Sequence, residues 1–345
     1  MSVKRWGSIP VLAAALACGV LAGCGGSSAG SGGQSITLYS GQHPQTTDKL
    51  IAAFEKKTGI TVNARSDDED VLAAQIMTEG SRSPADIFYA ENSPPLQFLQ
   101  DKGLLAPVKS ATLAATPAKY NSARGDWVGI SARVSVLIYN PRLIARGQLP
   151  TSVLQLADSR YKGKLALAAG ETDFQPIVTS VLHSQGQAAT LRWLTGLKAN
   201  ATGHLYPDNE TVASDVNRGT AAFGIINQYY WYRMRSEIGA AATHSQLAYF
   251  APHDPGYVID VSGAAALKAS AHQAAAQKFL AFLVSKQAQE IIGAQSASYE
   301  YPLAAGVTTA APETPFSKLQ PNAITIGELG DGSPAVALLR QAGLL

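Results

Sequence analysis

The sequence predicts an α/β fold with largely parallel strands, arranged in two lobes. Short β-branched segments alternate along the chain with longer segments in which apolar residues recur at helical spacing. Residues 127–139 form an apolar stretch longer than a typical strand, so we expect this segment to cross from one lobe to the other. The 311 residues that follow position 34 of the 345-residue chain can bury a sizeable core, and this length more often forms two lobes than one.

The individual elements follow from periodicity and from the residues that end each segment. The expected strands are residues 36–40, 60–64, 85–90, 127–139, 165–169 and 221–226, then 246–250 and 258–261 as a return crossing, and 264–269. The first expected helix begins at about Thr47 and ends at Gly59, and the second includes residues 71–77. A third opens at Pro94-Pro95, and a fourth follows Gly170-Glu171-Thr172-Asp173. The last two run from Tyr229 to Ile238 and from about His272 to Val284. The tail from about Pro312 is expected to pack on the second lobe.

The N-terminus predicts a lipoprotein signal peptide. Lys4 and Arg5 precede an apolar run that is too short for a transmembrane span, and Leu21-Ala22-Gly23-Cys24 closes this run. We expect removal of residues 1–23 and acylation of Cys24, which would anchor the protein to the membrane. Residues 24–34 are rich in glycine and serine and are expected to form a flexible tether. An ordinary cleaved signal peptide with a chance cysteine is the alternative.

Composition argues against several other classes of protein. Cys18 leaves with the signal peptide and Cys24 would carry lipid, so the mature chain keeps no thiol for a disulfide, a zinc cluster or nucleophilic catalysis. Removing Lys4 and Arg5 from the 27 cationic residues leaves 25, which balance the 25 anionic ones. The chain has no basic stripe, which argues against nucleic acid as a partner. It also has no nucleophile elbow or zinc-helix motif of the kind found in secreted hydrolases, so we expect no enzymatic activity.

Four polar side chains follow expected strands. His43 comes after the first strand, Glu91 after the third, and the pair Tyr229-Tyr230 after residues 221–226. Open α/β sheets bind ligands beyond the carboxyl ends of their strands, so we expect these side chains to converge. With Asn227 as the N-cap, both tyrosines lie in the first turn of a helix, where their side chains diverge by roughly 100°. The helix dipole would help to lower the pKa of both phenols.

The chemistry of these side chains indicates a hard trivalent cation. Two phenolates and Glu91 carry three negative charges, which neutralise Fe³⁺, and His43 completes a mixed set of nitrogen and oxygen ligands. The lack of thiolates disfavours copper(I) and zinc, and calcium would require more carboxylates and carbonyls. Each residue also has an ordinary interpretation. The aromatic run Tyr229-Tyr230-Trp231-Tyr232 can pack a core or stack a ligand, Glu91 can be a solvated acid, and His43 can be a turn residue or a helix cap.

Several stretches match one known family in the same order along the chain. They are Leu38-Tyr39-Ser40-Gly41-Gln42-His43, Glu79-Gly80-Ser81-Arg82-Ser83-Pro84-Ala85-Asp86 with Phe88-Tyr89-Ala90-Glu91, Ile226-Asn227-Gln228-Tyr229-Tyr230-Trp231, Ser262-Gly263-Ala264-Ala265, and Glu300-Tyr301-Pro302-Leu303. In these stretches the chain resembles the periplasmic ferric iron-binding proteins (bacterial transferrin type), which are substrate-binding proteins of ABC importers. The resemblance implies His43, Glu91, Tyr229 and Tyr230 as iron ligands. It also implies a two-lobe periplasmic-binding-protein fold (type II) with crossing hinge strands, which closes over the ion.

The function implied by the resemblance is capture of ferric iron outside the cytoplasm and its delivery to an ABC permease and its ATPase. The expected lobes are residues 35–132 with 259–311 and residues 133–258 with 312–345, and we expect a monomer. The alternative is a receptor of the same fold for an organic or anionic solute, such as a thiamine, a polyamine or a phosphonate. In that case the aromatic run would stack on the ligand or cage it, and His43 would be incidental.

The chain departs from the family at the anion site. The resemblance implies that a synergistic anion, phosphate or carbonate, completes the iron shell at a helix start in the second lobe, near amides at Asn92, Asn209 and Asn227. Here that helix start reads Glu171-Thr172-Asp173-Phe174, and its two carboxylates would repel the anion that a helix N-terminus otherwise binds.

Two explanations of this departure remain open. In the first, Thr172 or Asp173 caps the helix and the acids point away. In the second, Glu171 or Asp173 stands in for the anion, or a different anion is used. Arg133, inside the expected crossing strand, can pair with the anion or with an acid across the hinge, and we favour the second role.

Overall fold

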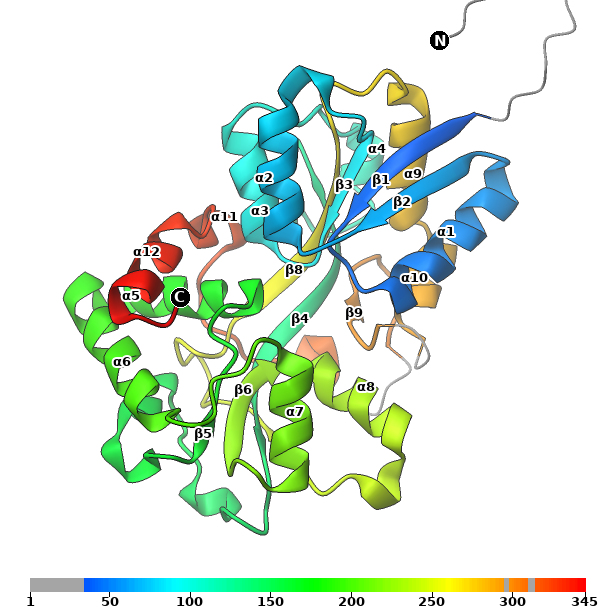
Figure 1. Ribbon diagram of the computed structural model, residues 1–345. Coiled ribbons are helices and arrows are strands. Elements are labelled where there is room, and N and C mark those ends of the chain that lie inside the picture. Colours follow the sequence, from blue (N-terminus) through cyan, green and yellow to red (C-terminus); the bar gives the residue numbers. More distant parts are fainter. Residues whose placement is uncertain (1–33, 295–297, 310–313) are drawn as a thin grey trace, which may run out of the picture. The chain divides into compact units, whose positions relative to one another are not determined.

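Strand β4 (Val128–Tyr139) lies inside the sheet and joins its two halves. The computed structural model describes residues 34–294, 298–309 and 314–345. The expected signal peptide, Cys24, nearly all of the expected tether and Pro312 therefore lie outside the described residues. The strands have the order β2-β1-β3-β8-β4-β6-β5, and β7 and β9 also pair with β4 (Figure 1).

The bounds of the elements are as follows. The strands are β1 (Ser35–Ser40), β2 (Thr61–Ser66), β3 (Ile87–Ala90), β4 (Val128–Tyr139), β5 (Leu165–Ala166), β6 (Phe223–Asn227), β7 (Gln246–Ala248), β8 (Ile259–Ala266) and β9 (Tyr301–Pro302). The helices are α1 (Pro44–Thr58), α2 (Glu69–Glu79), α3 (Ser93–Asp101), α4 (Ser110–Leu113), α5 (Gln175–Gln185), α6 (Gln187–Asn200), α7 (Asn209–Arg218), α8 (Gln228–Ile238), α9 (Gln273–Leu283), α10 (Lys286–Ile292), α11 (Ile326–Leu329) and α12 (Ser333–Ala342).

The crossing expected for residues 127–139 is present in β4. Its residues 128–134 pair with β8, and its residues 135–139 pair with β6. We call β1, β2, β3, β8 and β9 with their helices the N-terminal lobe, and β5, β6 and β7 with theirs the C-terminal lobe. Every residue of β4 is buried, as expected of a strand that is covered on both faces.

Strand β8 is one continuous strand, although the sequence predicted two separate strands over this region. Gly263 lies inside β8, where glycine normally weakens a strand. A Cβ atom at this position would lie 2.6 Å from Cδ1 of Leu96 on α3. The same Cβ atom would lie 3.1 Å from the backbone oxygen of Val128, so glycine suits the close packing around this strand and does not mark a break.

The expectation of largely parallel strands is wrong for the middle of the sheet. The pairs β1–β2, β1–β3 and β5–β6 are parallel. All pairings of β4 and β8 are antiparallel. Strand β4 leads the chain out of the N-terminal lobe and β8 returns it, so these neighbours run in opposite directions. The result is a mixed sheet.

Helices cover both faces of the N-terminal sheet. Alternate residues of β1 point to opposite faces, so Leu38 joins one apolar cluster with Phe54 of α1 and Phe279 of α9, while Tyr39 joins another with Leu72 of α2. The rings of Phe54 and Phe279 meet edge to face, with centroids 4.9 Å apart. This packing on both faces positions β1, and so the loop at its carboxyl end that leads to His43.

Several element ends differ from expectation by a few residues. Helix α1 begins at Pro44 rather than at Thr47, because proline suits the first helical turn. Strand β5 stops at Ala166 rather than at residue 169, and Leu167 continues only as a single bridge to Leu205. These shifts leave the order of elements unchanged.

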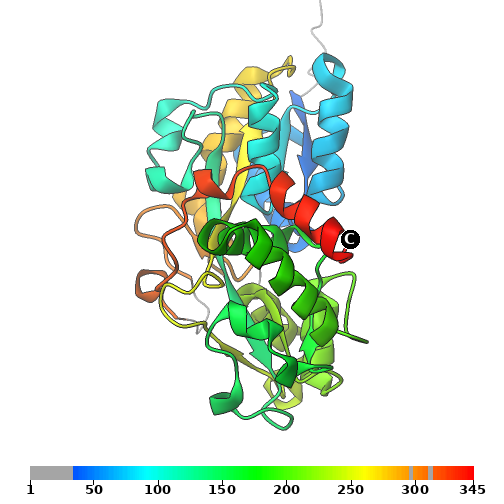
Figure 2. The ribbon, with the colours of Figure 1, turned by 90° about the vertical axis from the view of Figure 1, so that its left-hand side faces the viewer.

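The C-terminal tail lies on α5 and α6. Helix α12 packs against both of these helices, and the short α11 contacts α5 and also α3 of the N-terminal lobe (Figure 2). Within the described ranges, no helix combines the length and the apolar character needed to cross a membrane.

Candidate functional site

The four predicted ligands all lie where the chain leaves a strand. His43 is the N-cap residue of α1, just beyond β1, and Glu91 directly follows β3. Tyr229 and Tyr230 lie in the first turn of α8, which directly follows β6. His43 and Glu91 thus belong to the N-terminal lobe, and the two tyrosines belong to the C-terminal lobe.

The structure brings these four side chains together. The Tyr229 hydroxyl donates to Oε1 of Glu91, and Nε2 of His43 lies 3.0 Å from the same oxygen. The rings of Tyr229 and Tyr230 lie side by side, with centroids 4.2 Å apart and planes inclined at 34°. The imidazole of His43 meets both rings edge-on, at centroid distances of 5.6 Å and 5.9 Å. One imidazole, one carboxylate and two phenols therefore converge at the junction of the lobes.

The electrostatic setting of the tyrosines differs from expectation. Burial raises the pKa of Tyr229 and of Tyr230 well above the ordinary value, and the charges of Asp173 and Glu91 raise both further. The sequence predicted that the helix dipole would help to lower the pKa of both phenols. Their net pKa shift is upward, because burial and nearby carboxylates outweigh the dipole. Both phenols remain protonated at neutral pH until a cation displaces their protons.

Glu91 is ionised under the same conditions. Burial alone would raise its pKa, but the charge and hydrogen bond of His43, the charge of Arg133 and the hydrogen bond of Tyr229 lower it to about 2. A buried carboxylate that stays ionised provides a fixed negative charge for a cation.

Arg133 forms the polar centre of the crossing strands. Its guanidinium is fully buried and donates to the carboxylate of Glu300 and to the backbone carbonyl of Glu91. Its Nη1 also lies 3.2 Å from Oδ1 of Asn92 and 4.0 Å from Oδ1 of Asp173. Of the two roles considered for Arg133, the geometry matches pairing with acids from both lobes. Glu300 was not identified from sequence as its partner.

Arg233 is a site residue that sequence reasoning missed. Its Nη1 lies 3.2 Å from Nδ1 of His43 and 3.2 Å from Oε1 of Glu210. Its guanidinium also faces the rings of Tyr229 and Tyr230, at 5.3 Å and 5.7 Å from their centroids. The signal was available, since Arg233 follows the tyrosines by three and four residues and so shares their helix face.

Asp173 points into the site. It lies in a 3₁₀ turn (Thr172–Phe174) before α5, and its carboxylate is buried. Oδ1 accepts from the Asn92 amide at 2.9 Å, and Oδ2 accepts from the Asn209 amide at 3.0 Å and from the Tyr229 hydroxyl at 3.3 Å. The explanation in which Thr172 or Asp173 caps the helix and the acids point away is wrong for Asp173, because its oxygens are held by these side chains.

The other predicted anion-site residues lie near Asp173. Asn227 occupies the N-cap position of α8 as expected, but its side chain makes no capping hydrogen bond to the described backbone. It lines a small cavity together with Asp173 and Asn209. Glu171 and Thr172 line the larger cavity described next. Burial, followed by the charges of Asp173 and Glu91, raises the pKa of Glu171 to about 9.

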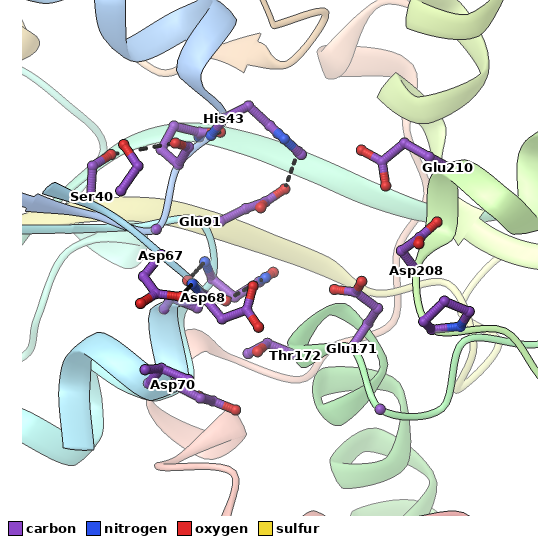
Figure 3. Close-up of a pocket in the computed structure, with 18 of the residues that line it drawn as sticks. Ser40, His43, Asp67, Asp68, Asp70, Glu91, Glu171, Thr172, Asp208 and Glu210 are labelled. Atoms are coloured by element: carbon purple, nitrogen blue, oxygen red, sulfur yellow. Dashed lines mark hydrogen bonds and ion pairs between the residues drawn. The ribbon is translucent and has the colours of Figure 1, made fainter. Parts of the chain in front are cut away.

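A cavity of about 800 Å³ opens beside the four converging side chains. Its acidic lining residues come from both lobes and are Asp67, Asp68, Glu69, Asp70, Glu91, Glu171, Asp208 and Glu210. Figure 3 shows His43 and Glu91 approaching each other, with Glu171 and Glu210 across the cavity from them. Among the described residues that line it, none is lysine or arginine. The cavity therefore favours cations over anions.

A metal cluster built from histidine, cysteine, aspartate and glutamate alone is not present in the described part of the chain. The converging set contains only one histidine and one carboxylate of those types. Its other two members are phenols, which bind hard, highly charged cations once deprotonated.

The fold and the site together define a class of protein. Residues 40–290 match the family model of the bacterial extracellular solute-binding proteins. The Fe(3+)-binding periplasmic protein of Serratia marcescens is 37% identical over 320 residues, which cover 93% of this chain and 94% of that protein. The major ferric iron-binding protein of Neisseria meningitidis serogroup A is 37% identical over 311 residues, or 90% of this chain and 93% of the relative.

Solved structures give the same grouping. Iron-bound HitA from Pseudomonas aeruginosa superposes with a TM-score of 0.86 and 41% identity, covering 90% of this chain and 99% of HitA. The chain belongs to the periplasmic ferric iron-binding proteins within the solute-binding class. The family resemblance and the two-lobe fold expected from the sequence are thereby confirmed.

Proposed function

We propose that this protein binds ferric iron outside the cytoplasm and delivers it to the permease and ATPase of an ABC importer. The observation that carries the proposal is the convergence of His43, Glu91, Tyr229 and Tyr230 from two lobes. Relatives that match most of the chain are named as ferric iron-binding proteins, which supports the same cargo here.

The donor chemistry supports Fe³⁺ over softer or less charged ions. Once the phenols lose their protons, the two tyrosines and Glu91 supply three negative charges and His43 supplies one nitrogen. The site lies between lobes that crossing strands connect, so closure of the lobes can exclude the water and hydroxide that precipitate ferric iron. Binding is non-enzymatic in this proposal, because the cargo leaves unchanged.

Further parts of the proposal concern placement in the cell. We infer that Cys24 carries lipid and that residues 24–34 tether a monomeric body to the membrane surface. The lobes would comprise residues 35–132 with 259–311 and residues 133–258 with 312–345. Replacing Cys24 by serine should release the protein from the membrane fraction without changing iron binding.

The decisive experiment is iron loading of the purified protein. Protein purified without chelators should contain iron by elemental analysis and should show a visible phenolate-to-iron charge-transfer band. The double variant Tyr229→Phe/Tyr230→Phe should lose the band, and its affinity for iron should fall by more than about a hundredfold. Mutating a residue that only hydrogen-bonds to a metal ligand already lowers metal affinity by about 10–100-fold. Tyr232→Phe, on the same helix, is the matched control and should keep the band.

The alternative solutes are tested in the same preparation. Calorimetry with ferric citrate should give binding, whereas a thiamine, a polyamine and a phosphonate should give none. The acidic cavity makes the polyamine the most informative of these controls, because it is a cation of suitable size. A charge-transfer band that survives in the double tyrosine variant, or tight polyamine binding without any iron binding, would contradict the proposal.

A further inference from the structure

The N-terminal lobe has a second end, opposite the candidate site. His43 and Glu91 follow the carboxyl ends of the parallel strands β1 and β3, whereas the described chain enters at the other end of β1. Figures 1 and 2 both show the start of β1 at the end of this lobe that is away from the C-terminal lobe. We call this end the tether pole, because the expected tether leads into it, and define it as residues 34–35, 56–61, 79–86, 101–104, 124–126 and 267–272.

Exposed cationic side chains gather on the tether pole. Asp101 is the one exposed acid among its residues, whereas the exposed cationic residues are Lys56, Lys57, Arg82, Lys102, Arg124 and Lys268. The two lysines of α1 lie in the last turn of that helix, and Lys102 is the C-cap residue of α3. Lys268 is held beside this cap, because its backbone N–H donates to the carbonyl oxygen of Leu104 at 2.8 Å.

The other charges at the tether pole leave most of these cations available. Asp101 pairs with Arg124 at 3.1 Å, and the half-buried Glu79 accepts from a serine hydroxyl at 2.6 Å. Burial raises the pKa of Asp126, and the nearby charges of Arg124 and Lys268 act against this rise. Among the ion pairs of the described ranges, none contains Lys56, Lys57, Arg82, Lys102 or Lys268.

Charge is therefore distributed unevenly between the two ends of the N-terminal lobe. The end that faces the C-terminal lobe borders the acidic cavity, whose described lining residues include no lysine or arginine. An anionic surface would attract the tether pole and repel the mouth of the cavity. Both effects favour the same orientation of the molecule.

The tether pole also exposes apolar surface beside its lysines. A hollow of about 190 Å³ is lined by Ile76, Leu104 and Leu267 together with Lys268. Met77, in the last turn of α2, is 43% exposed. This combination suits the headgroup region of a membrane, where the stem of a lysine contacts apolar groups while its ammonium meets phosphate.

The length of the tether makes even a weak attraction to the membrane effective. Cys24 and Gln34 are ten positions apart, and this segment is rich in glycine and serine. A flexible chain of this length spans about 16–19 Å on average and at most about 36 Å. A lipid on Cys24 would therefore keep the tether pole close to the membrane surface, so that binding to this surface becomes intramolecular.

We propose that the tether pole docks on the anionic phosphate headgroups of the membrane that holds the lipid anchor, which places the acidic cavity at the far end of the N-terminal lobe from the membrane surface. The inference rests on the anchor in the proposed function, since the anchor supplies the proximity. The contact is electrostatic and reversible, so it leaves the protein free to reach its permease.

The test is lysine footprinting of the full-length lipoprotein, extracted from membranes and reconstituted into vesicles. A membrane-impermeant acylating reagent modifies exposed amines, and mass spectrometry gives the rate at each lysine. On vesicles that contain phosphatidylglycerol, the pole lysines Lys56, Lys57, Lys102 and Lys268 should react at least about threefold more slowly than on pure phosphatidylcholine. Salt at 1 M should remove this protection, because it shortens the Debye length to about 3 Å.

Matched lysine pairs on the two lobes sharpen the result. Lys102→Gln/Lys268→Gln should lose at least half of the protection at the two lysines of α1, because each lysine at an anionic surface strengthens binding by about fivefold. Lys162→Gln/Lys164→Gln neutralises two exposed lysines of the C-terminal lobe and should keep the protection. Both variants should develop the same iron charge-transfer band as the wild type, which shows that they are folded.

The outcomes separate this inference from the proposed function. Equal rates on the two kinds of vesicle refute docking, while the anchor and ferric binding stand. Protection at Lys162 and Lys164 in place of the pole lysines refutes the assignment of the surface. Unchanged protection in Lys102→Gln/Lys268→Gln refutes the headgroup contact. If mass spectrometry finds no lipid on Cys24, the anchor fails and the inference fails with it, and iron loading of the same sample shows whether ferric binding stands.

Discussion

At the scale of single residues, the phenols of Tyr229 and Tyr230 determine how iron binding should respond to acid. Burial and the charges of Asp173 and Glu91 raise both pKa values well above their ordinary value, so both hydroxyls are protonated at neutral pH. Glu91, whose pKa is lowered to about 2, has no proton to give. Iron binding should therefore release about two protons per ion.

The sign of the pH dependence follows directly. Lower pH supplies protons that compete with iron for the phenolates, so affinity falls as pH falls. With two protons exchanged, the apparent dissociation constant should rise about a hundredfold for each unit of pH below neutral. A pH-stat titration with iron measures the released protons. Release of none, or affinity that is constant between neutral pH and pH 5, would contradict the phenolate assignment.

The buried pair of Arg133 and Glu300 should be essential for stability. Both side chains are nearly inaccessible to solvent, and Glu300 also accepts from Gln42 and Ser131. Arg133→Met leaves the carboxylate of Glu300 buried without its cation, which should lower the free energy of unfolding by about 3–5 kcal/mol. Urea denaturation of iron-free protein measures this loss. The double variant Arg133→Met/Glu300→Gln should recover most of it, and a single variant within about 1 kcal/mol of the wild type would refute the pairing.

The sequence supports prediction of some site residues and not of others. His43, Glu91 and the tyrosine pair could be predicted to meet because each directly follows a strand, and strand ends share one edge of a sheet. The direction in which the Asp173 side chain points could not be predicted, because side-chain orientation in a 3₁₀ turn depends on tertiary partners such as Asn92. The pairing of Arg133 with Glu300 joins residues 167 positions apart and has no local pattern.

At the scale of elements, the start of α7 supports the site indirectly. Asp208 caps this helix by accepting from the backbone N–H of Thr211 at 2.6 Å, and Asn209, the first residue of α7, donates to Asp173. Asp208→Ala should lower the free energy of unfolding by about 1 kcal/mol, since it removes the cap. It should also weaken iron binding, because the position of Asn209 loosens.

A matched substitution separates the contribution of helix capping by Asp208 from the contribution of its charge. Asp208→Ser removes the carboxylate from the cavity but keeps a capping hydroxyl, so its stability should stay within about 0.5 kcal/mol of the wild type. Thermal or urea denaturation of both variants makes the comparison. Equal losses in the two variants would show that charge, and not capping, is the contribution of Asp208.

At this scale the elements expected from sequence have the expected type, but helices α6, α7, α10 and α12 were not expected and strand direction could not be predicted. Apolar periodicity and stop residues such as Gly59 identify helices and strands because they reflect local packing and backbone preference. Whether β8 runs parallel or antiparallel to β3 depends on the path of the chain through the second lobe. The sequence also predicted two strands, residues 258–261 and 264–269, where β8 is one continuous strand through Gly263.

At the scale of the whole molecule, the site is complete only when the lobes are together. His43 and Glu91 come from the N-terminal lobe, whereas Tyr229, Tyr230 and Asp173 come from the C-terminal lobe. The lobes also present carboxylates to each other across the cavity (Figure 3). Without a cation these like charges repel each other and favour the open arrangement of the lobes. A ferric ion bound by groups from both lobes favours the closed arrangement.

Iron should therefore close the molecule about the crossing strands β4 and β8, which connect the lobes and can act as a hinge. Small-angle X-ray scattering of iron-free and iron-loaded protein should show a smaller radius of gyration with iron, because closure brings the lobes together. The Tyr229→Phe/Tyr230→Phe variant exposed to the same iron is the control and should keep the larger value, since the C-terminal lobe then lacks its phenolates. Identical radii with and without iron in wild-type protein would mean that the lobes stay closed throughout, and that iron enters through the acidic cavity without hinge motion.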